Sequence, residues 1–482
     1  MLKATTILSA MFIAIGGFLF GYELGIVSST LAQPHFIATF GNPSDAVIGG
    51  IVSCYTVTGG AIIGTMFVSL INDRFGRKKA IFFGAGIGTF GCALQAGSTS
   101  LGMLITGRIL AGFSIGILTS TIPMYCAEIA PAEHRGALAG LLQWMLSWGF
   151  LVAQWMGYGC NFVDSAFQWR FPIAFQCVPA GILFCGALFL DESPRWLVDK
   201  ERFEEAHKSI RSLHGNGQNQ DFLHQELEDI KVSIMLERQA NATTWKFFFT
   251  NPVARKKLLL GCGVQFFTQT SGLNVVAYYG PRIYATLGID VNTSLKIIGI
   301  SGYLAVVYTS IALYFLDKVG RIKPLIVGAF GCGSALLVTA VLSQYYAPGP
   351  GANQSALRAQ VAMNFVLNFF FVALGVVSWV YPSEIFPTEL RAKGNSATTF
   401  VNWATGLFFA QISPIALGNI GFKYFYVFFV FDMIATLCFA FFYPETKGIT
   451  LEAMDALFGG GICQPSTVEH VEKTSAEDMK RV

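Results

Sequence analysis

Long apolar runs alternate with short polar connections along almost the whole chain. A transmembrane helix needs about 20 consecutive, mostly apolar residues, and roughly twelve stretches of the sequence meet this condition. They are residues 7–29, 48–70, 80–98, 102–125, 136–159, 170–190, 257–280, 295–316, 324–345, 359–382, 397–417 and 422–443. The pattern predicts an all-α membrane protein with twelve transmembrane helices, which has the lipid bilayer as its solvent.

The composition supports this class. Hydrophobic residues make up 53% of the 482 positions and charged residues only 13%, and the mean hydropathy of +0.53 is too high for a soluble chain of this length. The ten cysteines show no paired spacing, so we interpret them as small apolar residues rather than disulfide or metal ligands. We find no catalytic triad, nucleotide-binding loop or nucleic-acid patch, and therefore expect no enzyme activity, no cofactor and no nucleic-acid partner.

The positions of Lys and Arg predict the orientation in the membrane. Connections 30–47, 98–101 and 160–168 contain neither residue, whereas the alternate connections are basic. Basic connections stay in the cytoplasm, so both termini and the central loop are expected there, in a multi-pass protein of the plasma membrane. The glycosylation sequons at Asn292 and Asn353 then lie outside, and the one at Asn241 lies inside.

The spans divide six and six around a polar segment with helical periodicity. The predicted units are an N-terminal half (1–190), cytoplasmic linker helices (191–256), a C-terminal half (257–445) and a cytoplasmic tail (446–482).

Two charged motifs occur once in each half, at matching places. Both halves carry an acid and a base four residues apart after their second span, and a Glu and an Arg seven residues apart after their fourth. These residues are Asp73 and Arg77, Asp317 and Arg321, Glu128 and Arg135, and Glu384 and Arg391. Such duplication is typical of transporters whose two halves rock about a central site. A single basic turn could simply anchor a span, but two repeated pairs favour duplication.

Glu23 and Arg108 are charged residues inside apolar runs, where charge is costly and usually functional. Gly17, Gly21 and Gly25 share one helical face of the first span, and such a stripe allows close helix packing. We therefore predict an ion pair between Glu23 and Arg108. Alternatively, Arg108 could snorkel to the interface, or the pair could be purely structural.

An ion pair of this kind suits a proton switch. Burial disfavours the carboxylate and a guanidinium favours it, so a small helix shift would let Glu23 take up a proton, while arginine keeps its charge. Protons are then the coupling ion.

Neutral amides and aromatic residues predict the substrate. Gln143 lies on the fifth span; Gln265, Thr268 and Gln269 share a face of the seventh; and Asn274 joins them only if the backbone unwinds near Gly272. Trp379 and Asn402 contribute from the second half. Groups that both donate and accept suit a neutral polyhydroxylated ligand, although any single amide could equally bond between helices.

Together these motifs resemble the sugar porter family of the major facilitator superfamily, particularly the fungal hexose and pentose transporters. The resemblance covers residues 10–458 and rests on GGFLFGYELGIVSS, DRFGRKK, GRILAGFSIG, PMYCAEIAPAEHRG, ESPRWL, QTSGLNVVAYY, DKVGRIK, WVYPSEIFPTELRAKG, NW at 402–403 and PETKG at 444–448.

The resemblance implies the major facilitator fold and sugar contacts at Gln143, Gln269, Asn274, Trp379 and Asn402. It also implies that the repeated charged motifs are conformational latches, which Glu192 and Glu445 join. The chain departs from the family pattern at four positions. Glu23 stands where proton-coupled members usually have Asp, Thr268 replaces one Gln of a pair, Ala305 stands for Asn, and Val376 stands for Pro.

The resulting hypothesis is a monomeric, proton-coupled importer of a monosaccharide, with glucose and xylose as leading substrates. A facilitative uniporter with a structural Glu23 to Arg108 pair is the main alternative. A non-transporting sugar sensor is a further one.

Overall fold

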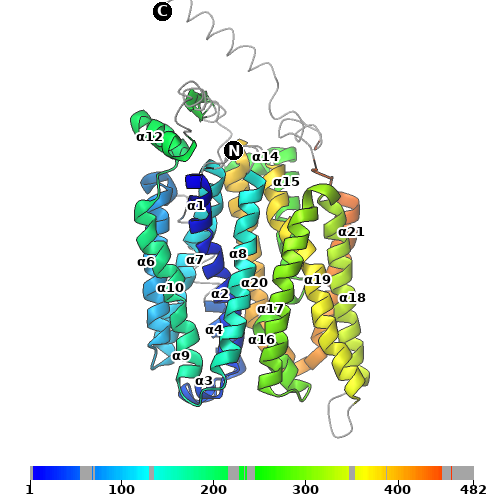
Figure 1. Cartoon of the computed structure of the whole chain (residues 1–482). Coiled ribbons are helices and arrows are strands. Elements are labelled where there is room, and N and C mark those ends of the chain that lie inside the picture. The colour runs from blue at the N-terminus through cyan, green and yellow to red at the C-terminus, as the bar shows by residue number, and fades with distance from the viewer. Residues whose placement is uncertain are drawn as a thin grey trace, which may run out of the picture.

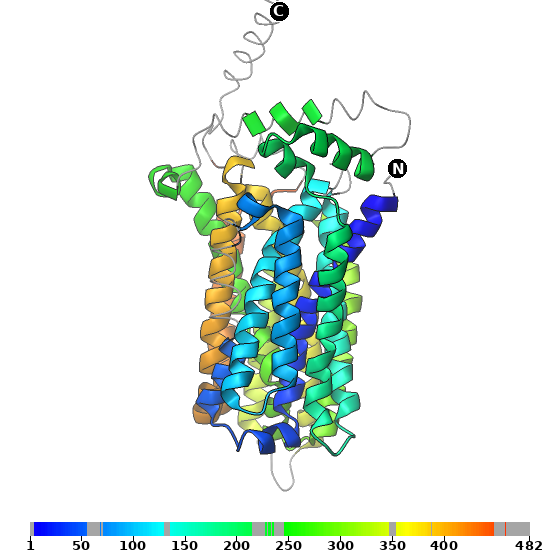
Figure 2. The same ribbon diagram turned by 90° about the vertical axis from the view of Figure 1, so that its left-hand side faces the viewer.

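The computed structural model describes residues 4–54, 68, 71–129, 135–214, 227–228, 230–232, 234–235, 245–346, 353–386, 388–447 and 458. Within these residues the chain is helical and contains no strand. The long helices run side by side as a bundle, with the short helices of the central segment and the start of α1 at one end (Figure 1). We call this the linker end and the opposite one the far end; a view from the side shows the same arrangement (Figure 2).

Helices match the predicted spans in order, although the second span is described only up to Cys54 and at Val68. In the N-terminal half they are α1 (Ala4–Ile13), α2 (Ile15–Leu31), α3 (Pro34–Thr39), α4 (Asp45–Cys54), α6 (Arg77–Ala96), α7 (Leu101–Ile129), α8 (Arg135–Cys160), α9 (Phe167–Phe175), α10 (Cys177–Gly186) and the 3-10 turn η3 (Ala187–Phe189). The linker forms α11 (Pro194–Asp199), α12 (Phe203–His214) and α14 (Trp245–Thr250). The C-terminal half contains α15 (Pro252–Gln269), α16 (Leu273–Thr286), α17 (Val291–Val319), α18 (Ile322–Tyr345), α19 (Gln354–Ile385), α20 (Thr388–Ile420), η4 (Gly421–Lys423) and α21 (Tyr424–Phe442).

The seventh predicted span is broken inside the bundle, at 270–272 between α15 and α16. In the first and sixth spans a single residue, Ala14 or Gln176, separates two helices, but its φ and ψ stay helical. At the break in the seventh span Gly272 has a φ of +76°, a conformation that glycine adopts without steric cost. Broken helices place free backbone groups and side chains near the middle of a bundle, where transporters bind their ligands.

The three largest hydrophobic clusters among the described residues form most of the core. One centres on the N-terminal half and includes Leu213 of the linker, and one centres on the C-terminal half and includes Phe248 and Phe458 outside it. The third joins the halves, because Tyr22 and Ile26 of α2 belong to the same cluster as Tyr279 and Ile283 of α16.

The glycine stripe of α2 packs against α8. A Cβ on Gly17 would lie 2.7 Å from the carbonyl oxygen of Leu142, and one on Gly25 would lie 3.0 Å from that of Phe150. Gly21 faces the backbone of Leu146 in the same way. The prediction that this stripe brings the first span close to Arg108 was therefore wrong: the stripe holds the first and fifth spans together, and Glu23 reaches α7 from another face.

Candidate functional site

Glu23 and Arg108 lie in one buried layer of the N-terminal half. Their exposed fractions are 1% and 4%, and the positive charge of Arg108 acts electrostatically on Glu23. Both side chains form hydrogen bonds with α6: Cys92 Sγ donates to Glu23 Oε1 over 3.3 Å, and Arg108 Nη1 donates to Gln95 Oε1 over 3.4 Å. Arg108 is too deeply buried to snorkel to the interface. The two charges thus face one another across a layer that α6 completes.

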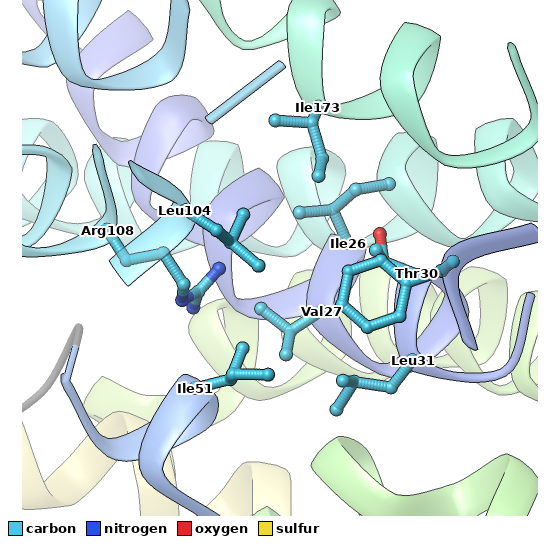
Figure 3. Close-up of a pocket in the computed structure, with 9 residues that line it drawn as sticks. Ile26, Val27, Thr30, Leu31, Ile51, Leu104, Arg108 and Ile173 are labelled. Atoms are coloured by element: carbon cyan, nitrogen blue, oxygen red, sulfur yellow. The ribbon is translucent and has the colours of Figure 1, made fainter. Parts of the chain in front are cut away.

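A small cavity lies beside Arg108 toward the far end. It measures about 10 Å³, close to the space that one water molecule needs. Figure 3 shows the Arg108 side chain among the apolar side chains that line it. A second cavity of about 130 Å³ lies further out and shares Leu31 and Phe36 with the first. These two side chains therefore lie between the Arg108 layer and the outer cavity.

Four predicted substrate-binding residues form one amide network in the C-terminal half. Gln269 Nε2 donates to Asn402 Oδ1 over 2.9 Å, and Asn402 Nδ2 donates to Gln265 Oε1 over 2.6 Å. Gln265 Nε2 donates to the carbonyl oxygen of Ser378 over 3.0 Å, and Asn274 donates to Gln269. Each amide can both donate and accept, so ligand hydroxyls can replace these bonds one for one.

The helix break explains how Asn274 joins the network. On an uninterrupted helix Asn274 would face away from Gln269, but the turn at Gly272 restarts the helix on a new axis. A Cβ on Gly272 would lie 2.8 Å from Leu336 Cδ1. The conditional prediction that the backbone unwinds near Gly272 is confirmed.

Three other predicted contacts lie outside this network. Thr268 donates its hydroxyl to the carbonyl oxygen of Val264 in its own helix, over 2.8 Å. Gln143 makes no side-chain hydrogen bond to the described residues and is half-buried. Trp379 is 39% exposed. Trp403, which follows Asn402 in the NW motif, is buried with its ring 5.5 Å from that of Phe20 across the two halves.

At the linker end of the N-terminal half, an ion pair lies beside a carboxylate that caps the start of α6. Arg77 Nη2 lies 2.7 Å from Glu128 Oε1. Glu192 Oε1 accepts the backbone N–H groups of Arg77 and Lys78 over 2.8 and 3.2 Å, at the start of α6. Ser193 Oγ donates to Glu128. We call this group the N-terminal latch.

The C-terminal half repeats this arrangement closely. Arg321 Nη2 lies 2.7 Å from Glu384 Oε1. Glu445 accepts the backbone N–H groups of Arg321 and Ile322 over 2.8 and 3.1 Å, at the start of α18. Thr446 Oγ1 donates to Glu384 Oε2 over 2.6 Å. This C-terminal latch confirms the internal repeat at atomic level.

Both latches fasten helices of one half to each other. Each capping carboxylate faces a glycine with positive φ, +88° at Gly76 and +93° at Gly320, and a negative charge at a helix N-terminus is favourable. Asp73 contributes its backbone, whose carbonyl oxygen accepts from Trp196 Nε1 over 3.2 Å. The side chains of Arg135, Asp317 and Arg391 lie outside the described part of the chain.

The two capping carboxylates have opposite pKa shifts. Burial raises the pKa of Glu192, and the hydrogen bonds from Ser193, Lys78 and Arg77 lower it only in part. Burial also raises the pKa of Glu445, but four backbone N–H groups outweigh it and the net pKa is lowered. Burial raises the pKa of Asp73.

Sequence reasoning missed several buried polar groups. Cys92, Gln95 and Gln176 surround the Glu23 layer, but neutral polar residues are too common in spans to attract notice. Asp432 could have been found, because it is the only acidic or basic residue of α21. It is fully buried, and neither carboxyl oxygen has a hydrogen-bond partner among the described residues.

Comparisons with known proteins agree with this geometry. Residues 9–458 match the family described as "Sugar (and other) transporter". The chain is 36% identical over 448 residues to the MFS-type transporter criB of Aspergillus cristatus, covering 92% of this chain and 91% of the relative. It is 34% identical over 474 residues to the high-affinity glucose transporter of Kluyveromyces lactis, covering 95% and 86%.

A solved structure has the same architecture. The proton:xylose symporter XylE bound to 6-bromo-6-deoxy-D-glucose superposes with a TM-score of 0.77 and 26% sequence identity, over 95% of this chain and all of that one.

Fold and site thus define a multi-span membrane transporter with the major facilitator fold, not an enzyme. The chain belongs to the sugar transporter family.

Proposed function

We propose that the protein imports a monosaccharide together with a proton by alternating access, with glucose and xylose as the leading substrates. The observation that carries the proposal is the pairing of two sites in one bundle: the amide network of Gln265, Gln269, Asn274 and Asn402, and the buried Glu23 facing Arg108.

The amide network supports a neutral sugar. Among the described residues its members exchange hydrogen bonds with one another and with one backbone carbonyl. A sugar hydroxyl donates one hydrogen bond and accepts others, so it can substitute for these contacts without leaving a buried amide unsatisfied. Names of relatives support the same class, since one is a glucose transporter and another a proton:xylose symporter.

The Glu23 layer supports proton coupling. A carboxyl that is 1% exposed binds a proton readily when its neutralising cation withdraws. Each proton that moves inward with a neutral sugar gains about 2.3 kcal/mol per 100 mV of membrane potential. The protein residues would hold the proton without any cofactor.

The arrangement also supports the orientation expected from the basic connections. We infer that the linker end is cytoplasmic and the far end external in the plasma membrane, and that a single copy suffices because both sites lie within one chain. Each latch would fasten the cytoplasmic ends of helices within its own half, so that the half moves as one unit when the cytoplasmic side opens.

Substitution of Glu23 tests the coupling. The transporter is reconstituted in vesicles, and labelled glucose and xylose uptake is measured with and without an inward pH gradient, together with sugar-induced proton entry. We expect Glu23→Gln to abolish proton entry and sugar accumulation while it retains sugar exchange at equal pH. Gln143→Ala serves as the sugar-site control, because it should weaken both modes.

Three other outcomes separate the alternatives. Wild-type uptake that ignores the pH gradient, with accumulation unchanged in Glu23→Gln, would indicate a uniporter. Absence of any sugar uptake by correctly folded protein would favour a sensor. An inward proton current without sugar would refute strict coupling.

A further inference from the structure

The Cys92 thiol lies between two buried oxygen atoms. Its Sγ is 3.3 Å from Glu23 Oε1 of α2 and 3.2 Å from Gln176 Oε1, at the junction between α9 and α10. All three residues are at most 1% exposed. The thiol therefore connects three helical segments of the N-terminal half at the level of the proposed proton site.

This geometry gives the thiol two acceptors for one hydrogen. A thiol carries a single S–H donor, and both neighbouring atoms are oxygen acceptors, so only one of them can receive the hydrogen at a time. Glu23 Oε2 and Gln176 Nε2, the remaining polar atoms of the two side chains, have no hydrogen-bond partner among the described residues. The thiol hydrogen is thus shared between two acceptors, Glu23 Oε1 and Gln176 Oε1.

The protonation state of Glu23 decides between the acceptors. A carboxylate is the stronger acceptor and takes the thiol hydrogen, because hydrogen bonds to charged groups are roughly twice as strong as neutral ones. A protonated Glu23 can itself donate its O–H to Cys92 Sγ, which leaves the thiol hydrogen for Gln176 Oε1. No covalent bond changes except the one that the arriving proton forms with Glu23.

We propose that Cys92 is a positioning residue whose thiol turns from Glu23 to Gln176 when Glu23 binds a proton, and so transmits the proton's arrival to the junction of α9 and α10 in the sixth span. The inference rests on the proposed proton coupling and deepens it. Gln176 lies at this junction, where Pro179 has no N–H to donate to the carbonyl oxygen of Phe175, so a new hydrogen bond there can shift α9 relative to α10.

The other titratable or charged groups near Glu23 lie on α7, α10 and α2. Arg108 faces it from α7 and Cys177 from α10, and Tyr22 neighbours it on α2. Arg108 is the charged group among them, and it favours ionised Glu23. Cys92 supplies the hydrogen bond that does the same from α6, so removing the thiol leaves the Arg108 interaction intact.

The pH profile of sugar uptake tests the proposal. We expect Cys92→Ala to raise the external pH of half-maximal uptake by about half a unit to one unit, because ionised Glu23 loses a donor. Cys92→Ser should bring the midpoint back to the wild-type value or below, since a hydroxyl is the stronger donor. The matched control is Cys126→Ala, which removes another buried thiol of the same half and should leave the midpoint unchanged.

Infrared difference spectra between high and low pH give a second readout, taken first on the wild-type protein. We expect its S–H stretching band to shift with pH, and this shift to disappear in Cys92→Ser, which assigns the band. Wild-type vesicles without sugar-induced proton entry would refute proton coupling itself. Normal proton entry combined with an unchanged pH midpoint in Cys92→Ala, or with a pH-independent S–H band, would overturn the role of Cys92 alone.

Discussion

Asp432 is a buried acidic residue whose carboxyl lowers the stability of the fold unless it has a function. Its carboxyl is fully buried in α21 and has no hydrogen-bond partner among the described residues. It packs against α18, where a Cβ on Gly333 would lie 2.9 Å from Asp432 Cβ. Burying such a group without a partner is costly, so the carboxyl must reduce the stability of the C-terminal half unless it performs a task.

Replacing Asp432 with leucine, which has the same branching at Cγ, should therefore stabilise the protein. Exchange of buried charged groups for apolar ones of similar shape often contributes about 1–4 kcal/mol, so we expect a higher apparent melting temperature in detergent with transport retained. Asp432→Asn is the control, because it keeps the polarity and should give a smaller gain. A correctly folded leucine variant that no longer transports sugar would show that the carboxyl has a function.

Residues of the site differ in how clearly the sequence alone marks them as functional. Glu23 and Arg108 stand out because charge inside an apolar run is rare. Cys92 and Gln176 do not, because their importance depends only on which helices pack around Glu23. The amides were visible as a set, but only the structure separates Gln265 in the network from Thr268, whose hydroxyl bonds to its own helix.

At the scale of elements, the break in the seventh span and the junction in the sixth were partly predictable. Gly272 indicated the break in the seventh span, because Asn274 could reach Gln269 in no other way. The junction at Gln176 keeps helical φ and ψ, and Pro172 and Pro179 on either side of it are its sequence signal. The glycine stripe of α2 predicted close packing correctly, but a stripe does not name its partner, which proved to be α8.

The two helix caps at the linker end make a second prediction, on pH. The pKa of Glu445 is lowered in the folded protein, so its stabilising effect is fully present above its unfolded pKa and is lost as the pH falls through the folded value. The pKa of Glu192 is raised by burial, so the fold favours its protonated form, and that contribution is lost as the pH rises through the folded value.

Matched glutamine substitutions distinguish the two caps. At neutral pH we expect Glu445→Gln to lower the apparent melting temperature more than Glu192→Gln, because only Glu445 gains stability from its charge there. The deficit of Glu445→Gln should shrink as the pH is lowered toward 4, near the ordinary pKa of glutamate. Equal losses in the two variants at neutral pH, or a deficit of Glu445→Gln that stays constant down to pH 4, would contradict the opposite shifts.

At the scale of the whole molecule, contacts between the halves run along the bundle and include a charged and a polar pair toward the far end. Asp45 of α4 forms an ion pair with Arg282 of α16. Ser53 Oγ donates to Gln411 Oε1 of α20 over 2.6 Å. The sequence predicted two duplicated halves because the latch motifs repeat, but these cross-half contacts have no motif. They depend on how the halves close on each other.

We expect the ion pair of Asp45 and Arg282 to hold the external side closed. Both side chains are more than a third exposed, so the pair contributes modestly, and Asp45→Arg should increase opening about two- to fivefold by replacing attraction with repulsion. A cysteine introduced at Val27, which lines the inner cavity, reports opening through its reaction rate with a membrane-impermeant maleimide, quantified by peptide mass spectrometry.

Arg282→Asp should have the same effect, because it also places like charges together. The double exchange Asp45→Arg with Arg282→Asp restores attraction and should return the rate to that of the unexchanged protein. Rates that rise in both single variants and stay high in the double variant would mean that the charges matter separately and that the pair is not the closing contact.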